Sequence, residues 1–224
     1  MGRHIRNETK KSRRKGEVVM KIELVALGRN EVKKAVRSHG NFYIPVAIES
    51  GTNTCSIRDC IPLRQVIGTD VYTSVSLDGR LATVGDIVEE GFTSMEDAFI
   101  AARNASQDLV EIANIGEMFG YEGLDLFALT TNGGRRGASV LSMTTCFRDI
   151  CRKLNVSGVY LLPSSINEAL VVPDTLDASI AKKVSGLKMI VREINGDKSL
   201  VPEEIVLSDN VFYYKSGDAS LSTV

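Results

Sequence analysis

The chain has 224 residues, with 27 Lys and Arg against 28 Asp and Glu, and 43% of its residues are hydrophobic. This composition excludes a chain that is disordered throughout, because the apolar residues suffice to build a core. No stretch approaches the roughly 18 apolar residues of a membrane-spanning helix, and no apolar signal region follows the basic N-terminus. We therefore expect a cytoplasmic protein with reduced cysteines and no contact with a membrane.

Residues 1–19 form a basic arm, with seven Lys and Arg residues against two Glu residues, so the rest of the chain is acidic. Three interpretations stay open. The arm is a solvated, disordered tail, or it binds nucleic acid by neutralising phosphates. In the third interpretation it is not part of the natural protein, because residues 14–17 can be encoded by a purine-rich ribosome-binding sequence that precedes a start at Met20.

Residues 20–90 are predicted to form a β-rich N-terminal region. Residues 71–77 alternate in the manner of a strand, and Asp78-Gly79 predicts a hairpin with residues 80–84 as the return strand. The earlier elements expected from periodicity and turn residues are a strand at 20–27, a short helix at 30–38, a strand at 42–48 and a turn at 50–53.

The pattern changes to helical spacing after residue 93. Thr93 or Ser94 is the expected N-cap, and two acidic residues follow in the first turn, where the helix dipole favours them. Apolar residues at helical spacing predict that this helix extends to Phe119, where Gly120 ends it.

Residues 91–215 are predicted to form an α+β C-terminal domain, followed by a tail at 216–224. The element order is β-α-β-β-α-β, the split βαβ arrangement of ferredoxin-like folds. Both helices are expected on one face of the sheet, which leaves the other face for the N-terminal half or a partner. The predicted elements are strands at 124–131, 159–162, 169–172 and 211–214 and helices at 139–154 and 180–194.

Histidine chemistry is nearly excluded. His4 lies in the arm and His39 lies in a turn, and neither stands beside a nucleophile motif. We therefore expect no Ser-His or Cys-His mechanism, and the interpretation leans against an enzyme.

The four cysteines occur as two pairs, Cys55 with Cys60 and Cys146 with Cys151. Four thiolates can hold zinc, but residues five apart on a helix point about 140° from one another. We therefore predict core cysteines, no metal site and no cofactor.

Two loops of the C-terminal domain hold the candidate ligand-binding or anion-binding residues. Arg135 and Arg136 lie in a glycine-rich loop where backbone amides can approach an anion, although it matches no phosphate-loop motif. The alternative is a mobile turn with two solvated arginines. The second loop contributes Ser164, Ser165 and Asn167, whose side chains can equally bond to nearby backbone.

The final predicted strand holds the only aromatic cluster. Alternation predicts that Phe212 and Tyr214 share one face and that Tyr213 takes the other. Packing in the core is the expected role, and an exposed strand that stacks bases is the alternative.

The segments 159–170 and 201–214, with their Leu-Pro-Ser-Ser and Pro-Glu-Glu to Ser-Asp-Asn runs, resemble domain-of-unknown-function family 5688. The resemblance covers roughly residues 95–215 and implies a bacterial protein, chiefly of Firmicutes, with frequent links to mobile elements. Relatives often carry histidine where this chain has Asn167. If that histidine is catalytic in the family, this chain has lost the catalytic group at position 167.

The leading hypothesis is a non-catalytic protein that binds an unidentified protein partner. Two alternatives stay open. One is a small-molecule or nucleotide enzyme that uses the loops 132–137 and 163–168, which requires one pocket that joins them. The other is nucleic-acid binding through residues 1–19.

Overall fold

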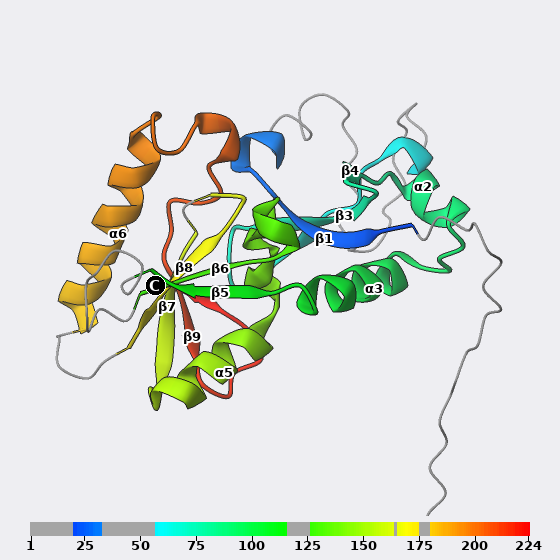
Figure 1. The fold of residues 1–224 in the computed structure, drawn as a ribbon. Helices are drawn as coiled ribbons and strands as arrows, with labels where there is room; N and C mark the ends of the chain where they lie inside the picture. The colour runs from blue at the N-terminus through cyan, green and yellow to red at the C-terminus, as the bar shows by residue number, and fades with distance from the viewer. Residues whose placement is uncertain (1–19, 33–56, 116–125, 164, 175–179) are drawn as a thin grey trace, which may run out of the picture.

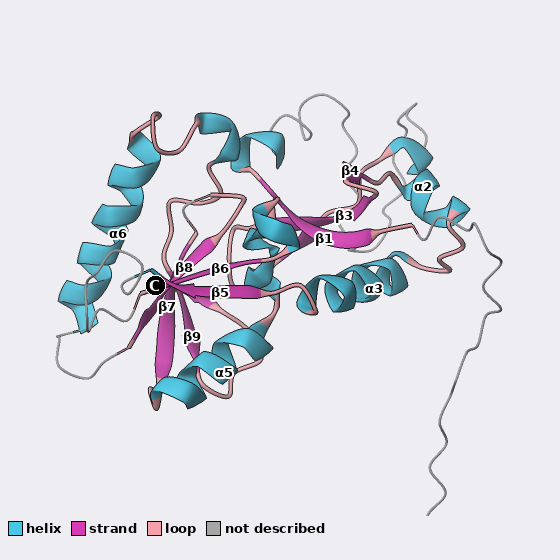
Figure 2. Cartoon of the chain, in the orientation of Figure 1, coloured by secondary structure: helices cyan, strands magenta, loops and turns pink. Residues whose placement is uncertain are grey.

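The computed structural model describes residues 20–32, 57–115, 126–163, 165–174 and 180–224. They form two antiparallel sheets with helices around them (Figures 1 and 2). The predicted α+β class is confirmed. Residues 29–32 are helical, whereas the arm at 1–19, the strand at 42–48 and the turn at 50–53 lie outside the described residues.

The N-terminal sheet is built around β3 (Tyr72–Leu77), which pairs with β1 (Ile22–Leu27) along its whole length. On its other edge β3 pairs with two short strands, β2 (Arg64–Gln65) and β4 (Arg80–Leu81). A single turn of 3-10 helix, η1 (Ile57–Asp59), precedes β2.

The predicted hairpin at Asp78-Gly79 is confirmed. Both residues have positive φ, 50° and 83°, which is what a two-residue hairpin turn requires. The return strand is shorter than residues 80–84, because Thr83 caps the next helix, α2 (Val84–Glu89). Asp86 completes a reciprocal capping box with Thr83, so the backbone leaves the sheet there.

The helix expected after residue 93 is α3 (Met95–Gln107), and its N-cap is Ser94. The predicted extension to Phe119 is wrong. After Asp108 the chain forms β5 (Glu111–Asn114), which pairs with β6 (Phe127–Thr130). The residues at 109–113 fit helical spacing, but the ladder with β6 supplies long-range backbone hydrogen bonds that no local pattern reveals.

The C-terminal sheet has six strands in the order β10-β9-β7-β8-β6-β5, and every neighbouring pair is antiparallel. The helix expected at 139–154 is divided at Met143, where ψ is 70°, into a 3-10 segment and an α-helix. The elements from β6 onward are η2 (Asn132–Gly134), η3 (Gly137–Ser142), α5 (Thr144–Leu154), β7 (Gly158–Leu162), β8 (Ala169–Pro173), α6 (Ile180–Gly196), η4 (Glu203–Ile205), β9 (Phe212–Lys215) and β10 (Ser222–Thr223).

The ferredoxin-like order is not confirmed, because β9 pairs with β7, the second strand of the predicted unit, whereas a ferredoxin-like sheet pairs its last strand with the first. Each crossover still joins parallel strands across one antiparallel strand. The crossovers β6-α5-β7 and β8-α6-β9 both move across the sheet in the same direction, toward β10. However, β6 and β7 run opposite to β8 and β9. Right-handed crossovers then require the two helices to lie on opposite faces.

The expectation that both helices cover one face is therefore wrong. On β7, Val159 and Leu161 pack in the same core as α5, whereas the alternate residues Tyr160 and Leu162 pack with Leu187 and Val191 of α6. Consecutive residues of a strand point to opposite faces, so α5 and α6 lie on opposite sides of the C-terminal sheet (Figure 1).

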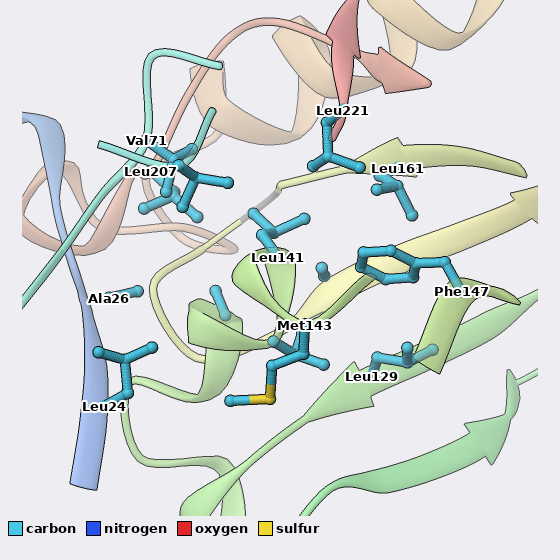
Figure 3. Close-up of a cluster of buried hydrophobic side chains, with 14 of the residues drawn as sticks. Leu24, Ala26, Val71, Leu129, Leu141, Met143, Phe147, Leu161, Leu207 and Leu221 are labelled. Carbon is cyan, nitrogen blue, oxygen red and sulfur yellow. The ribbon is translucent and has the colours of Figure 1, made fainter. Parts of the chain in front are cut away.

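The larger core is continuous between the two sheets. Leu24 and Ala26 of β1 belong to the same cluster as Leu129 of β6 and Phe147 of α5, as Figure 3 shows. The aromatic strand packs as predicted: Phe212 and Tyr214 are buried in this core, and the ring of Tyr214 lies 5.7 Å from that of Phe147. Within the described residues, no helix is long and apolar enough to cross a membrane.

Tyr213 lies on the α6 face and predicts a loss of stability at alkaline pH. Its hydroxyl donates to Asp174 Oδ2 at 2.9 Å, and burial followed by that carboxylate raises its pKa to about 12, from an ordinary value near 10. The folded state thus holds a proton that the unfolded state releases above pH 10, so stability is lost as the pH rises from 10 to 12. Urea denaturation at a series of pH values from 10 to 12 should show this fall of the free energy of unfolding in the wild type and a smaller fall in Tyr213→Phe. An equal fall in the two proteins would contradict the prediction.

Candidate functional site

The two loops with the candidate residues meet in the structure. The amide of Arg136 donates to Asn167 Oδ1 at 3.3 Å, and the amide of Ala138 donates to the carbonyl of Ile166 at 3.0 Å. Thr130 Oγ1 also donates to the carbonyl of Asn167 at 2.6 Å. The loops therefore contact each other directly through backbone and side-chain hydrogen bonds, without leaving a gap for a ligand between these atoms.

Ser165 and Asn167 stabilise their own loop. Ser165 is buried, and its hydroxyl accepts from the amide of Asn167 at 3.1 Å, which is a serine turn. These contacts match the alternative of local turn chemistry. Ser164 lies outside the described residues.

Arg136 is bound to the N-terminal sheet. Its two terminal nitrogens form a bidentate pair with the Glu31 carboxylate at 2.7 and 2.6 Å, and one of them also donates to the carbonyl of Ala26 at 3.2 Å. The backbone of Arg136 has a positive φ of 53°, and its carbonyl accepts from the amide of Ala26. A carboxylate of the same chain already holds this guanidinium, so an external anion would have to compete with Glu31.

A double-mutant cycle measures this contact. We expect Arg136→Met and Glu31→Gln each to lower the free energy of unfolding by about 1–2 kcal/mol, because each leaves a half-buried partner without its charge-assisted bonds. The double variant should cost clearly less than the sum, with a coupling of about 1 kcal/mol in urea denaturation. Strict additivity would show that the pair does not interact in solution.

Arg135 points elsewhere and remains available. It is exposed, and among the described residues no hydrogen bond or ion pair engages its guanidinium, which lies 3.3 Å from the position of a β-carbon on Gly79. It borders a pocket of about 70 Å³, here called the hairpin pocket, to which none of the described residues of the loop 163–168 contributes. The hairpin pocket is lined by Glu23, Val25, Ser76, Gly79, Leu81, Arg135 and Arg136.

A larger pocket, which no sequence pattern indicated, lies where the two sheets meet. This junction pocket has a volume of about 200 Å³. Arg64 of β2 and Arg103 of α3 contribute its charged groups, and Ser142 and Thr144 contribute hydroxyls at the start of α5. Its apolar lining includes Leu24, Phe99, Leu141 and Leu221.

The two arginines of the junction pocket differ in their surroundings. Arg64 forms a bidentate pair with Glu96 and lies 4.5 Å from the centre of the Phe99 ring, a cation–π contact. Arg103 is exposed, and no carboxylate of the described residues pairs with it. Because none of the described residues in the lining is acidic, the Glu96-bound Arg64 and the unpaired Arg103 leave this part of the pocket positive.

Three of the four cysteines, Cys60, Cys146 and Cys151, lie among the described residues. Among the described residues, no group of three or more His, Cys, Asp or Glu side chains is placed to hold a metal ion. Burial raises the pKa of the Cys146 and Cys151 thiols, so both remain protonated at neutral pH. Cys55, His4 and His39 lie outside the described residues.

A polar cluster joins the segments at 201–214 to the N-terminal residues. Arg29 forms ion pairs with Glu203 and Asp209, and Ser208 donates to Asp70 at 2.6 Å. Lys198 and then Asn30 lower the pKa of Glu203 to about 2. These charges satisfy one another, so the cluster holds the two parts of the chain together.

The comparisons address the region that contains these loops. No curated protein matches the chain, and no solved structure matches it. Residues 81–216 match a family of unknown function, DUF5688, which is more than half of the chain. That range contains α3, most of the C-terminal sheet and the Arg135 and Arg136 loop, whereas β1 and β3 precede it. The chain therefore belongs to the DUF5688 family.

Proposed function

We propose that this protein is a non-catalytic binding module that takes a carboxylate on a small apolar body into the junction pocket. The observation that carries the proposal is that Arg64 and Arg103 both line a pocket whose lining is largely apolar. A guanidinium matches a carboxylate in charge and in planar geometry, and two of its N–H groups can donate to the two oxygens.

The charge balance favours Arg103 as the principal partner of the carboxylate. The Glu96 carboxylate already occupies the fork of Arg64, which also stays fixed over the Phe99 ring. Arg103 comes from α3 and has no such partner, so its charge is available to a ligand. Thr144 can add a hydroxyl donor, whereas the Ser142 hydroxyl already donates to the carbonyl of Ser139 at 2.7 Å. Among the described residues, the lining offers no acid–base pair for catalysis.

The size and the rim of the junction pocket limit the ligand. A volume of about 200 Å³ is below the 300–1,000 Å³ typical of drug-sized ligands. It suits one aliphatic side chain with its carboxylate. Ile67, which is 75% exposed, borders the pocket and offers an apolar contact to anything that extends beyond it. The carboxylate can come from the C-terminal residue of a partner protein or from a free organic acid.

Fluorescence polarisation tests the proposal and separates the two sources. A labelled peptide that ends in a free leucine carboxylate should bind, and the same peptide with a C-terminal amide should bind about tenfold more weakly. If hexanoate displaces the labelled peptide with an affinity equal to that of the peptide, the ligand is a free organic acid. Arg103→Gln should weaken binding of either ligand by about tenfold, because the charged end loses its partner.

Arg148→Gln is the matched control, since Arg148 is an exposed arginine of α5 that does not line the junction pocket. It should leave the affinity unchanged. Equal affinity for the acid and the amide, or equal losses in the two arginine variants, would refute the proposal, as would the absence of binding by the peptide and hexanoate alike.

A further inference from the structure

We propose that the hairpin pocket binds a small zwitterion, an α-amino acid with a short side chain. This site lies beyond the proposed function and shares no lining residue with the junction pocket. Its chemistry follows from a buried carboxylate and an unpaired guanidinium that both line the pocket.

Glu23 is the buried carboxylate. It is 7% exposed and lies on β1 directly across from Ser76. Its Oε1 is paired with the ammonium group of Lys21, whose side chain is 61% exposed, and among the described residues no other partner of that oxygen is seen. A buried carboxylate needs a positive partner. The Lys21 contact shows that an ammonium group can reach Glu23, and an exposed lysine can be displaced by the ammonium of a ligand.

Arg135 supplies the opposite charge. Its guanidinium lies over the hairpin turn beside Gly79, whose lack of a side chain leaves it room. Among the described residues no carboxylate holds Arg135, whereas the neighbouring Arg136 is occupied by Glu31. The fork of Arg135 is therefore free to bind a ligand carboxylate in the bidentate manner.

The two charges select the ligand class. A simple anion would satisfy Arg135 and leave Glu23 as it is, and a simple cation would do the reverse, whereas a zwitterion satisfies both at once. Ser76 can add a hydroxyl contact, and the apolar side chains of Val25 and Leu81 border the remaining space. A volume of about 70 Å³ encloses the charged end of a small amino acid, with any side chain directed out of the pocket, and excludes a nucleotide.

Isothermal titration calorimetry of the full chain with alanine tests the inference. Alanine should bind, and acetate and methylamine should each bind at least about tenfold more weakly because each satisfies only one charge. Glu23→Gln and Arg135→Gln should each weaken alanine binding by about tenfold or more. Arg148→Gln serves as the control and should have no effect.

Three results would overturn the inference: no heat with alanine at tens of millimolar, equal binding of acetate and alanine, or binding that is indifferent to Glu23→Gln. Circular dichroism shows whether Glu23→Gln is folded, and Arg135→Gln alters only an exposed side chain, so at least one variant remains interpretable. Arg103→Gln should leave alanine binding intact, and Arg135→Gln should leave peptide binding intact. The proposals for the two pockets can therefore be refuted independently of each other.

Discussion

Gly137→Ala is expected to lower the free energy of unfolding by more than about 3 kcal/mol. A β-carbon on Gly137 would lie 1.9 Å from Thr130 Oγ1 and 2.5 Å from the amide nitrogen of Thr131. The second contact is with backbone, so a side-chain rotation cannot relieve it. Rotating Thr130 away would break its hydrogen bond to Asn167, which joins the two loops.

Chemical denaturation measures this loss, and Gly186→Ala is its control. Gly186 lies inside α6, and nothing lies within 4 Å of the position of its β-carbon. Alanine there should raise stability by about 0.5–1 kcal/mol, because it reduces the backbone freedom of the unfolded chain. Equal stability of the wild type and Gly137→Ala would show that the loops meet less closely than in this structure.

Local signals predicted the elements that local contacts stabilise. Ser94 marked the start of α3 because its side chain accepts from the amide of Asp97 within the first turn. Asp78-Gly79 marked the hairpin because positive φ at both positions is a property of the residues themselves. The strands and helices from β6 to β9 were recognised for the same reason, since their apolar periods are complete within each segment.

Local sequence patterns did not predict the elements whose structure depends on contacts with residues far away in the sequence. Residues 109–113 carry apolar spacing that suits a helix, and only the ladder with β6 makes Glu111–Asn114 a strand. The strand order was also invisible, because the same β-α-β-β-α-β sequence of elements is compatible with a last strand beside the first or beside the second. That choice determines whether α5 and α6 share a face.

The sites show the same limit. Arg135 and Arg136 were recognised together, yet only the structure separates them, since Glu31, which binds Arg136, lies 105 residues away in the sequence. Arg64 and Arg103 form no motif, and they meet at the junction pocket because β2 and α3 pack against the same end of the larger core. In the sequence Glu23 looks like any solvent-facing residue of a strand. Only the structure shows that it lines a pocket together with Gly79 of the hairpin and Arg135.

Gly68→Ala is expected to lower the free energy of unfolding and to connect stability with the junction pocket. Gly68 has a φ of 82°, and its β-carbon would lie 1.8 Å from the carbonyl oxygen of Leu221. Leu221 is 4% exposed, belongs to the larger core and lines the junction pocket. Thr223 also donates to the carbonyl of Gly68 at 2.8 Å. The added methyl group must displace this tail, at an expected cost of about 2–4 kcal/mol.

Gly91→Ala separates backbone strain from the clash. Gly91 has a similar φ of 87°, but nothing lies within 4 Å of the position of its β-carbon, so alanine there should cost only the strain of about 1–2 kcal/mol. If the tail forms one wall of the junction pocket, Gly68→Ala must weaken peptide or hexanoate binding by more than Gly91→Ala does, under conditions where both variants are folded. Equal affinities in the two variants would mean that Leu221 and its neighbours contribute nothing to the ligand, and that the two arginines hold it alone.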